Sequence, residues 1–239
     1  MYRDEDYART ASAAVRSGVV PNSFINRVFG WMFIGLAVTG GISWYLGTFQ
    51  QELILRYFKA YWIFCLAEVG LVIALSAGIR KFNTMLAALL FLVFAALNGV
   101  TLSWIFIRYS SDVIAGTFFA TSGTFGAMGL IGYLTKKDLS SVGGLCTMGL
   151  FGVIIASLVN VFWYNRTADL IISCIGVLIF VGLTAWDVQK IKLLAIELSE
   201  NSADSRDVKK WAVLGALTLY LDFINLFLFL LRLIGGGRK

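Results

Sequence analysis

The chain has 239 residues, of which 59% are hydrophobic and 14% are charged, and its net charge is +6 at pH 7. So large an apolar share exceeds that of ordinary soluble domains and indicates an integral membrane protein. The positive charge does not indicate nucleic-acid binding, because the basic residues lie at the ends of apolar segments instead of along one polar face. Histidine is absent, which excludes the usual zinc sites and histidine-based catalysis.

Seven apolar stretches of about 20 residues, each long enough to cross a bilayer core, are separated by short polar breaks. We expect helices, because the stretches lack the alternating pattern of barrel strands. The predicted fold is an all-α integral membrane protein, with a polar N-terminal tail over residues 1–23 and one seven-helix transmembrane domain over 24–239. The expected spans are residues 24–47, 61–79, 82–107, 113–134, 141–164, 169–191 and 209–234.

The distribution of basic residues predicts the orientation of the chain. With the N-terminus in the cytoplasm, thirteen Lys and Arg residues lie on the cytoplasmic side and seven on the other side. A cytoplasmic N-terminus is therefore expected, and seven spans then place the C-terminus on the opposite side. The N-terminal segment has no cleavage pattern, so the first span is expected to act as the signal itself.

The positions of cysteine and glycine indicate roles in helix packing and do not indicate a chemical site. Cys65, Cys146 and Cys174 fall in three different spans without paired spacing, so we expect buried thiols and neither a disulfide nor a metal site. Small residues allow helix backbones to approach closely in lipid. Two runs of glycine in the fourth and fifth spans predict such packing: Gly123, Gly126, Gly129 and Gly132, then Gly143, Gly144, Gly149 and Gly152.

Three acidic residues lie well inside spans, namely Glu68 in the second, Asp187 in the sixth and Asp222 in the seventh. A charge at that depth costs about 2.5–3.5 kcal/mol on insertion scales, so each should face the protein interior, a partner or water. Helical spacing predicts an inward-facing polar stripe on the seventh helix. Its members are Gly215, Thr218, Asp222 and Asn225, and a weaker stripe on the sixth helix holds Ser173, Gly176, Thr184 and Asp187, interrupted by Phe180.

Asp187 and Asp222 lie on consecutive antiparallel helices, so their inward faces can oppose each other. Asp222 would lie deeper than Asp187 unless the sixth helix runs on toward Glu197, tilts, or passes beyond the membrane surface. Two carboxylates that meet in a low dielectric share a proton. The pair could then serve as a proton-sensitive latch, a cation-binding point or the acid and base of an aspartic protease, or it could simply hold two helices together.

The protease alternative is disfavoured by sequence motifs. Intramembrane aspartic proteases resemble one another in a Gly-x-Gly-Asp sequence and a later Pro-Ala-Leu segment. Here Leu219-Tyr220-Leu221 precedes Asp222, and the single proline is Pro21. We therefore expect a protein that is not an enzyme.

Four segments together resemble the Bax-inhibitor family, the transmembrane Bax inhibitor motif proteins, and its bacterial inner-membrane branch in particular. They are AEVGLVIALS (67–76), GYLTKKDLS (132–140), FVGLTAWDVQKIK (180–192) and GALTLYLDFINLFLFLLR (215–232). The resemblance covers the whole chain. It implies seven helices with the last enclosed by the other six, and a pH-sensitive aspartate pair linked to calcium leak.

The resemblance also assigns residues. It places the aspartate pair at Asp187 and Asp222, matches Glu68 to the family's acidic residue on the second helix, and matches Arg80 and Lys81 to a basic helix end. We therefore expect a pH-sensitive leak channel or transporter for calcium or another cation in the bacterial inner membrane.

Calcium normally takes about six to eight oxygen ligands. Two carboxylates with Thr218 and Asn225 therefore predict weak, transient Ca²⁺ binding and no resident cofactor. Membrane lipid and a cation are the expected partners, and nucleic acid is not. The alternative is a non-enzymatic membrane regulator of stress, proteases or cell death that acts through protein partners. Its contact surfaces would be the N-terminal tail and residues 192–210.

Overall fold

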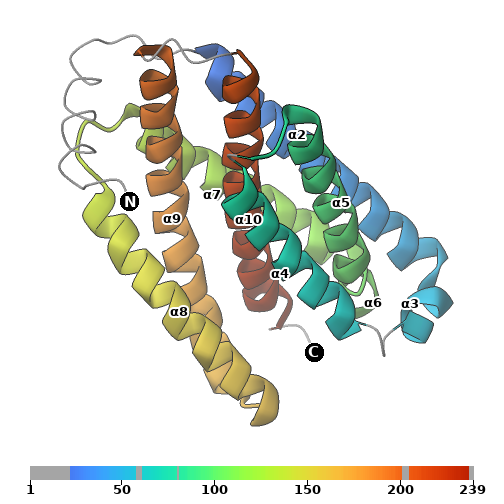
Figure 1. Cartoon of the computed structure of the whole chain (residues 1–239). Coiled ribbons are helices and arrows are strands. Elements are labelled where there is room, and N and C mark those ends of the chain that lie inside the picture. The colour runs from blue at the N-terminus through green and yellow to red at the C-terminus, as the bar shows by residue number, and fades with distance from the viewer. Residues whose placement is uncertain (1–21, 58–60, 80, 201–204, 237–239) are drawn as a thin grey trace. The chain divides into compact units, whose positions relative to one another are not determined.

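The computed structural model describes residues 22–57, 61–79, 81–200 and 205–236. This part of the chain is helical with no strand, which confirms the predicted all-α class (Figure 1). Seven of its helical stretches are long and apolar enough to cross a membrane. They are α2 (Asn22–Phe49), α4 (Tyr61–Gly78), α5 (Thr84–Leu102) with α6 (Ile105–Arg108), α7 (Ser111–Leu134), α8 (Ser140–Phe162), α9 (Arg166–Glu200) and α10 (Ser205–Gly236), and a short helix α3 (Gln51–Tyr57) follows α2.

The largest departure from the expected boundaries is at the end of the sixth span. Instead of ending near residue 191, α9 continues to Glu200, and α10 already begins at Ser205. The expected linker at 192–210 is therefore mostly helical within the described residues. This segment has a buried apolar face among its charged residues. Leu193 and Ile196, spaced by three, lie on that face and are only 7% and 2% exposed. This extension meets one of the conditions for Asp187 to reach the depth of Asp222.

Tertiary contacts divide the chain into two compact units. One contains Ala115–Ser199 and the chain from Leu221 onward, and the other contains Asn22–Ile114 and the chain from Glu200 to Tyr220. Helix α10 contributes to both units. The expected N-terminal tail lies almost entirely outside the described residues, and the single transmembrane domain stays a prediction.

In the unit that contains Asn22–Ile114, α2 and α5 pack through hydrogen bonds from side chains to the backbone. The hydroxyls of Thr39 and Ser43 donate to the carbonyl oxygens of Ala95 and Gly99, each at 2.8 Å. A Cβ at Gly99 would lie 2.9 Å from the Thr39 carbonyl oxygen, so glycine is what permits this approach.

The same unit buries Tyr220 of α10 completely. Its ring meets Phe91 and Phe94 edge to face, with centroids 5.8 and 5.6 Å away, and its hydroxyl lies 2.6 Å from Thr39 Oγ1. These contacts fix the part of α10 that ends two residues before Asp222.

In the other unit, α9 packs closely against α7 and α8. A Cβ at Gly132 of α7 would overlap the Ala185 carbonyl, and one at Gly143 of α8 would overlap the Trp186 indole. Only part of the predicted glycine packing is present, because a Cβ would meet open space at Gly123, Gly126, Gly144 and Gly152. The close approaches flank Asp187, which follows Ala185 and Trp186 directly.

Helix α10 is the most buried of the spans. In its most apolar window 67% of the residues are buried, compared with 44% for α9 and 6% for α4. Most side chains of α10 are therefore covered by other parts of the protein.

The cysteines are free thiols, but they are less buried than expected. Cys65 and Cys146 are half-buried, and Cys174 is exposed. The prediction of a buried thiol is wrong for Cys174, because this residue shares the exposed face of α9 with Ile171, Ile175 and Leu178.

Candidate functional site

Asp187 lies on a buried stripe of α9, as the helical spacing predicts. Ser173, Phe180 and Thr184 are 0%, 4% and 0% exposed, and Asp187 is 6% exposed. The hydroxyls of Ser173 and Thr184 donate to backbone carbonyls four residues earlier, which satisfies them within the helix. Asp187 is thus the one member of this stripe whose polar group is directed at other side chains.

A stacked aromatic pair sets the register between α9 and α10. The rings of Phe180 and Phe229 lie 5.8 Å apart at an interplanar angle of 30°. Phe180 precedes Asp187 by seven residues, and Phe229 follows Asp222 by seven. Seven residues are about two helical turns, so antiparallel helices in contact at the phenylalanines also bring the two aspartates face to face.

The carboxyl groups of Asp187 and Asp222 lie within hydrogen-bonding reach of each other. Asp222 is 4% exposed, and its buried Oδ2 has no N–H or O–H donor among the residues that the structure describes. A carboxylate can only accept hydrogen bonds, so a hydrogen bond between two carboxyl groups requires a proton on one of them. The geometry therefore suits a pair that holds one proton.

Lys190 lies beside the pair. Its Nζ is 3.2 Å from Asp187 Oδ1 and 4.2 Å from the centroid of the Trp186 ring. The Lys190 side chain is 42% exposed, whereas that of Asp187 is 9% exposed. This lysine connects the buried acids to the accessible surface of the unit. Its role at the pair was not predicted from the sequence, where it is one of several basic residues at the end of a span.

Thr218 and Asn225 donate hydrogen bonds to the backbone of α10 and not to the acids. Thr218 Oγ1 donates to the Leu214 carbonyl at 3.3 Å, and Asn225 Nδ2 donates to the Leu221 carbonyl at 2.8 Å. Both residues are only half-buried, so the inward stripe predicted for α10 holds for Asp222 and Gly215 but not for them. Both lie on a half-buried stripe of α10 together with Leu214, Leu221 and Leu228, so the spacing of the polar residues did not identify the buried face.

Glu68 belongs to a separate polar cluster between α4 and α5. Thr101 Oγ1 donates to Glu68 Oε1 at 2.8 Å, and Asn98 Nδ2 donates to Oε2 at 3.2 Å. Asn98 Oδ1 is buried without a partner within the described chain. Sequence reasoning missed these partners, although Asn98 and Thr101 are two polar residues spaced by three in an apolar span. Lys81 is exposed, and Arg80 lies outside the described residues.

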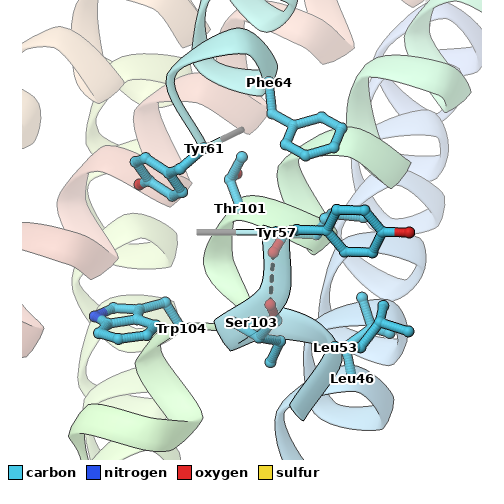
Figure 2. Close-up of a pocket in the computed structure, with 10 residues that line it drawn as sticks. Leu46, Leu53, Tyr57, Tyr61, Phe64, Thr101, Ser103 and Trp104 are labelled. Atoms are coloured by element: carbon cyan, nitrogen blue, oxygen red, sulfur yellow. Dashed lines mark hydrogen bonds between the residues drawn. The ribbon is translucent and has the colours of Figure 1, made fainter. Parts of the chain in front are cut away.

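A small cavity of about 40 Å³ lies in the same unit, near one end of α5 (Figure 2). Thr101 lines it, but the Thr101 hydroxyl is bonded to Glu68, and the Ser103 hydroxyl donates to the Val100 carbonyl at 2.6 Å. The remaining walls are apolar or aromatic, so the cavity presents no set of free polar ligands. The residues that form these walls are Leu46, Leu53, Ile54, Tyr57, Tyr61, Phe64, Val100 and Trp104.

Gln189 ties α9 to the loop between α7 and α8. Its Nε2 donates to the Lys137 carbonyl at 2.8 Å, and its Oε1 accepts from the Leu139 amide at 2.9 Å. Lys192 Nζ adds a bond to the Tyr133 carbonyl at the end of α7, at 2.8 Å. The turn of α9 that carries Asp187 is therefore held by α7, by α8 and by the loop that joins them.

The donor set at the acid pair bears on metal binding. Within the described ranges, no group of three or more His, Cys, Asp or Glu residues could hold a metal ion. Asp187 and Asp222 supply four carboxylate oxygens, of which Asp222 Oδ2 is unpartnered. Such a set has fewer oxygens than calcium normally takes, about six to eight, so it falls short of a tight calcium site.

Residues 21–239 match the family model described as "Inhibitor of apoptosis-promoting Bax1". The chain belongs to the Bax-inhibitor family. Among similar proteins, the inner membrane protein YbhL of Escherichia coli K12 is 44% identical over 219 residues, which cover 90% of this chain and 92% of YbhL.

Two further relatives extend the match across bacteria. An uncharacterized protein of Borreliella burgdorferi is 41% identical and covers 92% of this chain and 95% of its own length. An uncharacterized protein of Rickettsia prowazekii is 36% identical, and the match covers 98% of this chain and 99% of that protein. This member of the Bax-inhibitor family is accordingly a multi-pass membrane protein with a full-length relative in a bacterial inner membrane.

Proposed function

We propose that the protein is a pH-sensitive leak pathway for calcium or a similar cation in the inner membrane, gated by Asp187 and Asp222. The observation that supports this proposal is the contact between two buried carboxyl groups at the register set by Phe180 and Phe229. Buried acids of this kind are expensive in a membrane, and they usually mark an ion or proton pathway.

The gate works through the occupancy of one proton. With the proton present, the two acids form a hydrogen bond and α9 and α10 stay closed against each other. Without it, two negative charges oppose each other in a low dielectric, and the repulsion favours helix separation or the entry of a cation. No histidine is needed, because two acids in contact titrate as a pair.

The cation is the cargo of this pathway. When bound it would be held by oxygens of Asp187 and Asp222 and would supply the positive charge that offsets their repulsion. A site with few protein ligands releases its ion readily, which suits a leak better than storage.

The orientation proposed with this function places the N-terminus in the cytoplasm. The excess of basic residues on that side supports it. A single cysteine introduced at an end of a span, in a background that lacks the native cysteines, would report the sidedness through labelling by an impermeant maleimide.

Calcium-loaded vesicles that contain the purified protein test the function. Asp187→Asn and Asp222→Asn should each abolish the pH dependence of calcium release, because neither retains two ionisable groups. Asp207→Asn is a matched control, since Asp207 is an acid on α10 whose side chain is 50% exposed. An unchanged flux and pH profile in both pair variants contradicts the proposal.

The same experiment separates the alternative role. If pure protein shows no ion flux at any pH but crosslinks reproducibly to a defined membrane partner, the protein is a regulator and the acid pair is structural.

A further inference from the structure

Lys190 already holds the position that a cation at Asp187 would take. Its Nζ is 3.2 Å from Asp187 Oδ1, and its charge acts on both Asp187 and Asp222. A calcium ion binds carboxylate oxygens at about 2.3–2.6 Å. Both cations on one carboxyl group would therefore lie within a few ångströms of each other, where their repulsion is strong.

We propose that Lys190 is a built-in competitor of the transported cation, which must displace the ammonium group from Asp187 to bind the acid pair. This inference rests on the proposed function, because it concerns the same two acids. It assigns to Lys190 control over how tightly, and therefore how often, the pathway binds its ion.

The surroundings of Lys190 allow it to leave Asp187 and return. Its side chain is 42% exposed, so the ammonium group can move away from Asp187 without displacing packed side chains. The Trp186 ring lies 4.2 Å from Nζ and is a second partner for the charge when the contact with Asp187 is lost. That indole is fixed in place, since it packs directly on Gly143 of α8. A divalent ion carries twice the charge of the ammonium group and interacts more strongly with two carboxylates, so it can displace Lys190 from Asp187.

Terbium luminescence tests this inference apart from transport. Tb³⁺ binds the oxygen ligands that calcium prefers, and a nearby tryptophan sensitises its emission. Trp186 directly precedes Asp187, so Trp186→Phe identifies the emission that comes from this site. Purified protein in detergent is titrated with Tb³⁺, and Ca²⁺ is then added to displace it.

We expect Lys190→Met to bind Tb³⁺ about tenfold more tightly than the wild type, equivalent to about 1.4 kcal/mol. Lys190→Arg keeps the charge and should bind much as the wild type does. Lys210→Met is the matched control, because Lys210 forms an ion pair of the same spacing with Asp207, at 2.7 Å. Lys136→Met removes one exposed charge from the α7–α8 loop and reports the general effect of net charge.

The outcomes are distinct. Unchanged binding in Lys190→Met, or an equal gain in Lys136→Met or Lys210→Met, overturns the role of Lys190. If Asp187→Asn and Asp222→Asn change calcium flux while Lys190→Met changes neither Tb³⁺ binding nor flux, this inference fails and the proposed function stands. If the aspartate variants change neither calcium flux nor Tb³⁺ binding, both this inference and the proposed function fail.

Discussion

The indole of Trp186 on α9 packs directly on Gly143 of α8, and no room remains between them for a Cβ. Asp187 follows Trp186 in the chain, and Gln189 ties the next part of α9 to the α7–α8 loop through Lys137 and Leu139. The position of Asp187 therefore depends on how closely α8 approaches α9.

Gly143→Ala should destabilise the protein, because the new methyl group pushes α8 away from a fixed indole. Overpacking of this kind costs about 1–3 kcal/mol. Gly144→Ala is the matched control: its Cβ would meet open space, so the substitution should be neutral or slightly stabilising. The unfolding midpoints of the two variants are compared by heating samples in detergent and measuring the remaining folded protein by size-exclusion chromatography. Equal midpoints for both variants would contradict the close packing.

The stability losses caused by substituting Gly176 and Phe229 should partly offset each other in a double variant. A Cβ at Gly176 would lie 2.6 Å from the Phe229 ring, so Gly176→Ala alone should be destabilising. Phe229→Ala removes the ring that stacks on Phe180 and leaves a cavity, at a cost of about 3–5 kcal/mol. In the double variant the new methyl group occupies part of that cavity, so the combined loss should be smaller than the sum of the two single losses. Strict additivity in a double-mutant cycle on unfolding would show that the two residues do not touch.

Tyr220→Phe should cost about 0.5–1.5 kcal/mol. The Thr39 hydroxyl donates its hydrogen to the Ala95 carbonyl, so in the 2.6 Å contact the Tyr220 hydroxyl is the donor. Removing that hydroxyl leaves the Thr39 oxygen without its buried donor. Tyr45→Phe is the control, because Tyr45 is 52% exposed. The same thermal assay applies, and a loss in Tyr45→Phe as large as that in Tyr220→Phe would refute the assignment.

Glu68→Gln should weaken the contact between α4 and α5. Thr101 and Asn98 each donate to a different oxygen of the Glu68 carboxylate. Glutamine has one acceptor oxygen and places an NH₂ group against the second donor. Such a mismatch costs about 1–3 kcal/mol at a fully buried site and less at the part-buried Glu68. We expect a lower unfolding midpoint and an unchanged calcium flux per folded molecule. A changed flux at normal stability would instead place Glu68 on the ion pathway.

The sequence predicted which faces meet better than it predicted which atoms meet. The seven spans and the buried stripe of α9 follow from apolar length and helical spacing, and both depend on local pattern. The extension of α9 was predicted only as one of three conditions for the aspartates to meet, because Leu193 and Ile196 lie among charged residues that favour a linker. Thr218 and Asn225 were assigned to the site by spacing alone, although a hydroxyl or amide in a helix readily bonds its own backbone.

The hydrogen-bond partners of Glu68 and Gln189 were also not predicted, and the reason is different. Both side chains bond to residues at least 30 positions away in sequence, from Glu68 to Asn98 and from Gln189 to the loop before α8. Such pairs depend on how helices are placed in space, which spacing along one helix does not specify. The pairing of Asp187 with Asp222 was accessible because the two helices are consecutive and antiparallel.

Calcium binding should release protons from the acid pair. A divalent cation binds ionised carboxylates, so it displaces the proton that joins Asp187 and Asp222, and apparent calcium affinity should rise with pH and fall as pH falls. Adding Ca²⁺ to weakly buffered protein in detergent should acidify the solution, by up to about one proton per bound ion. Asp222→Asn removes the shared proton and should release almost none, whereas Asp207→Asn should behave as the wild type, because that acid is exposed and pairs with Lys210. Calcium binding with no proton release near neutral pH would mean that the ion binds elsewhere or that the pair is already fully ionised, and either result contradicts the proposed gate.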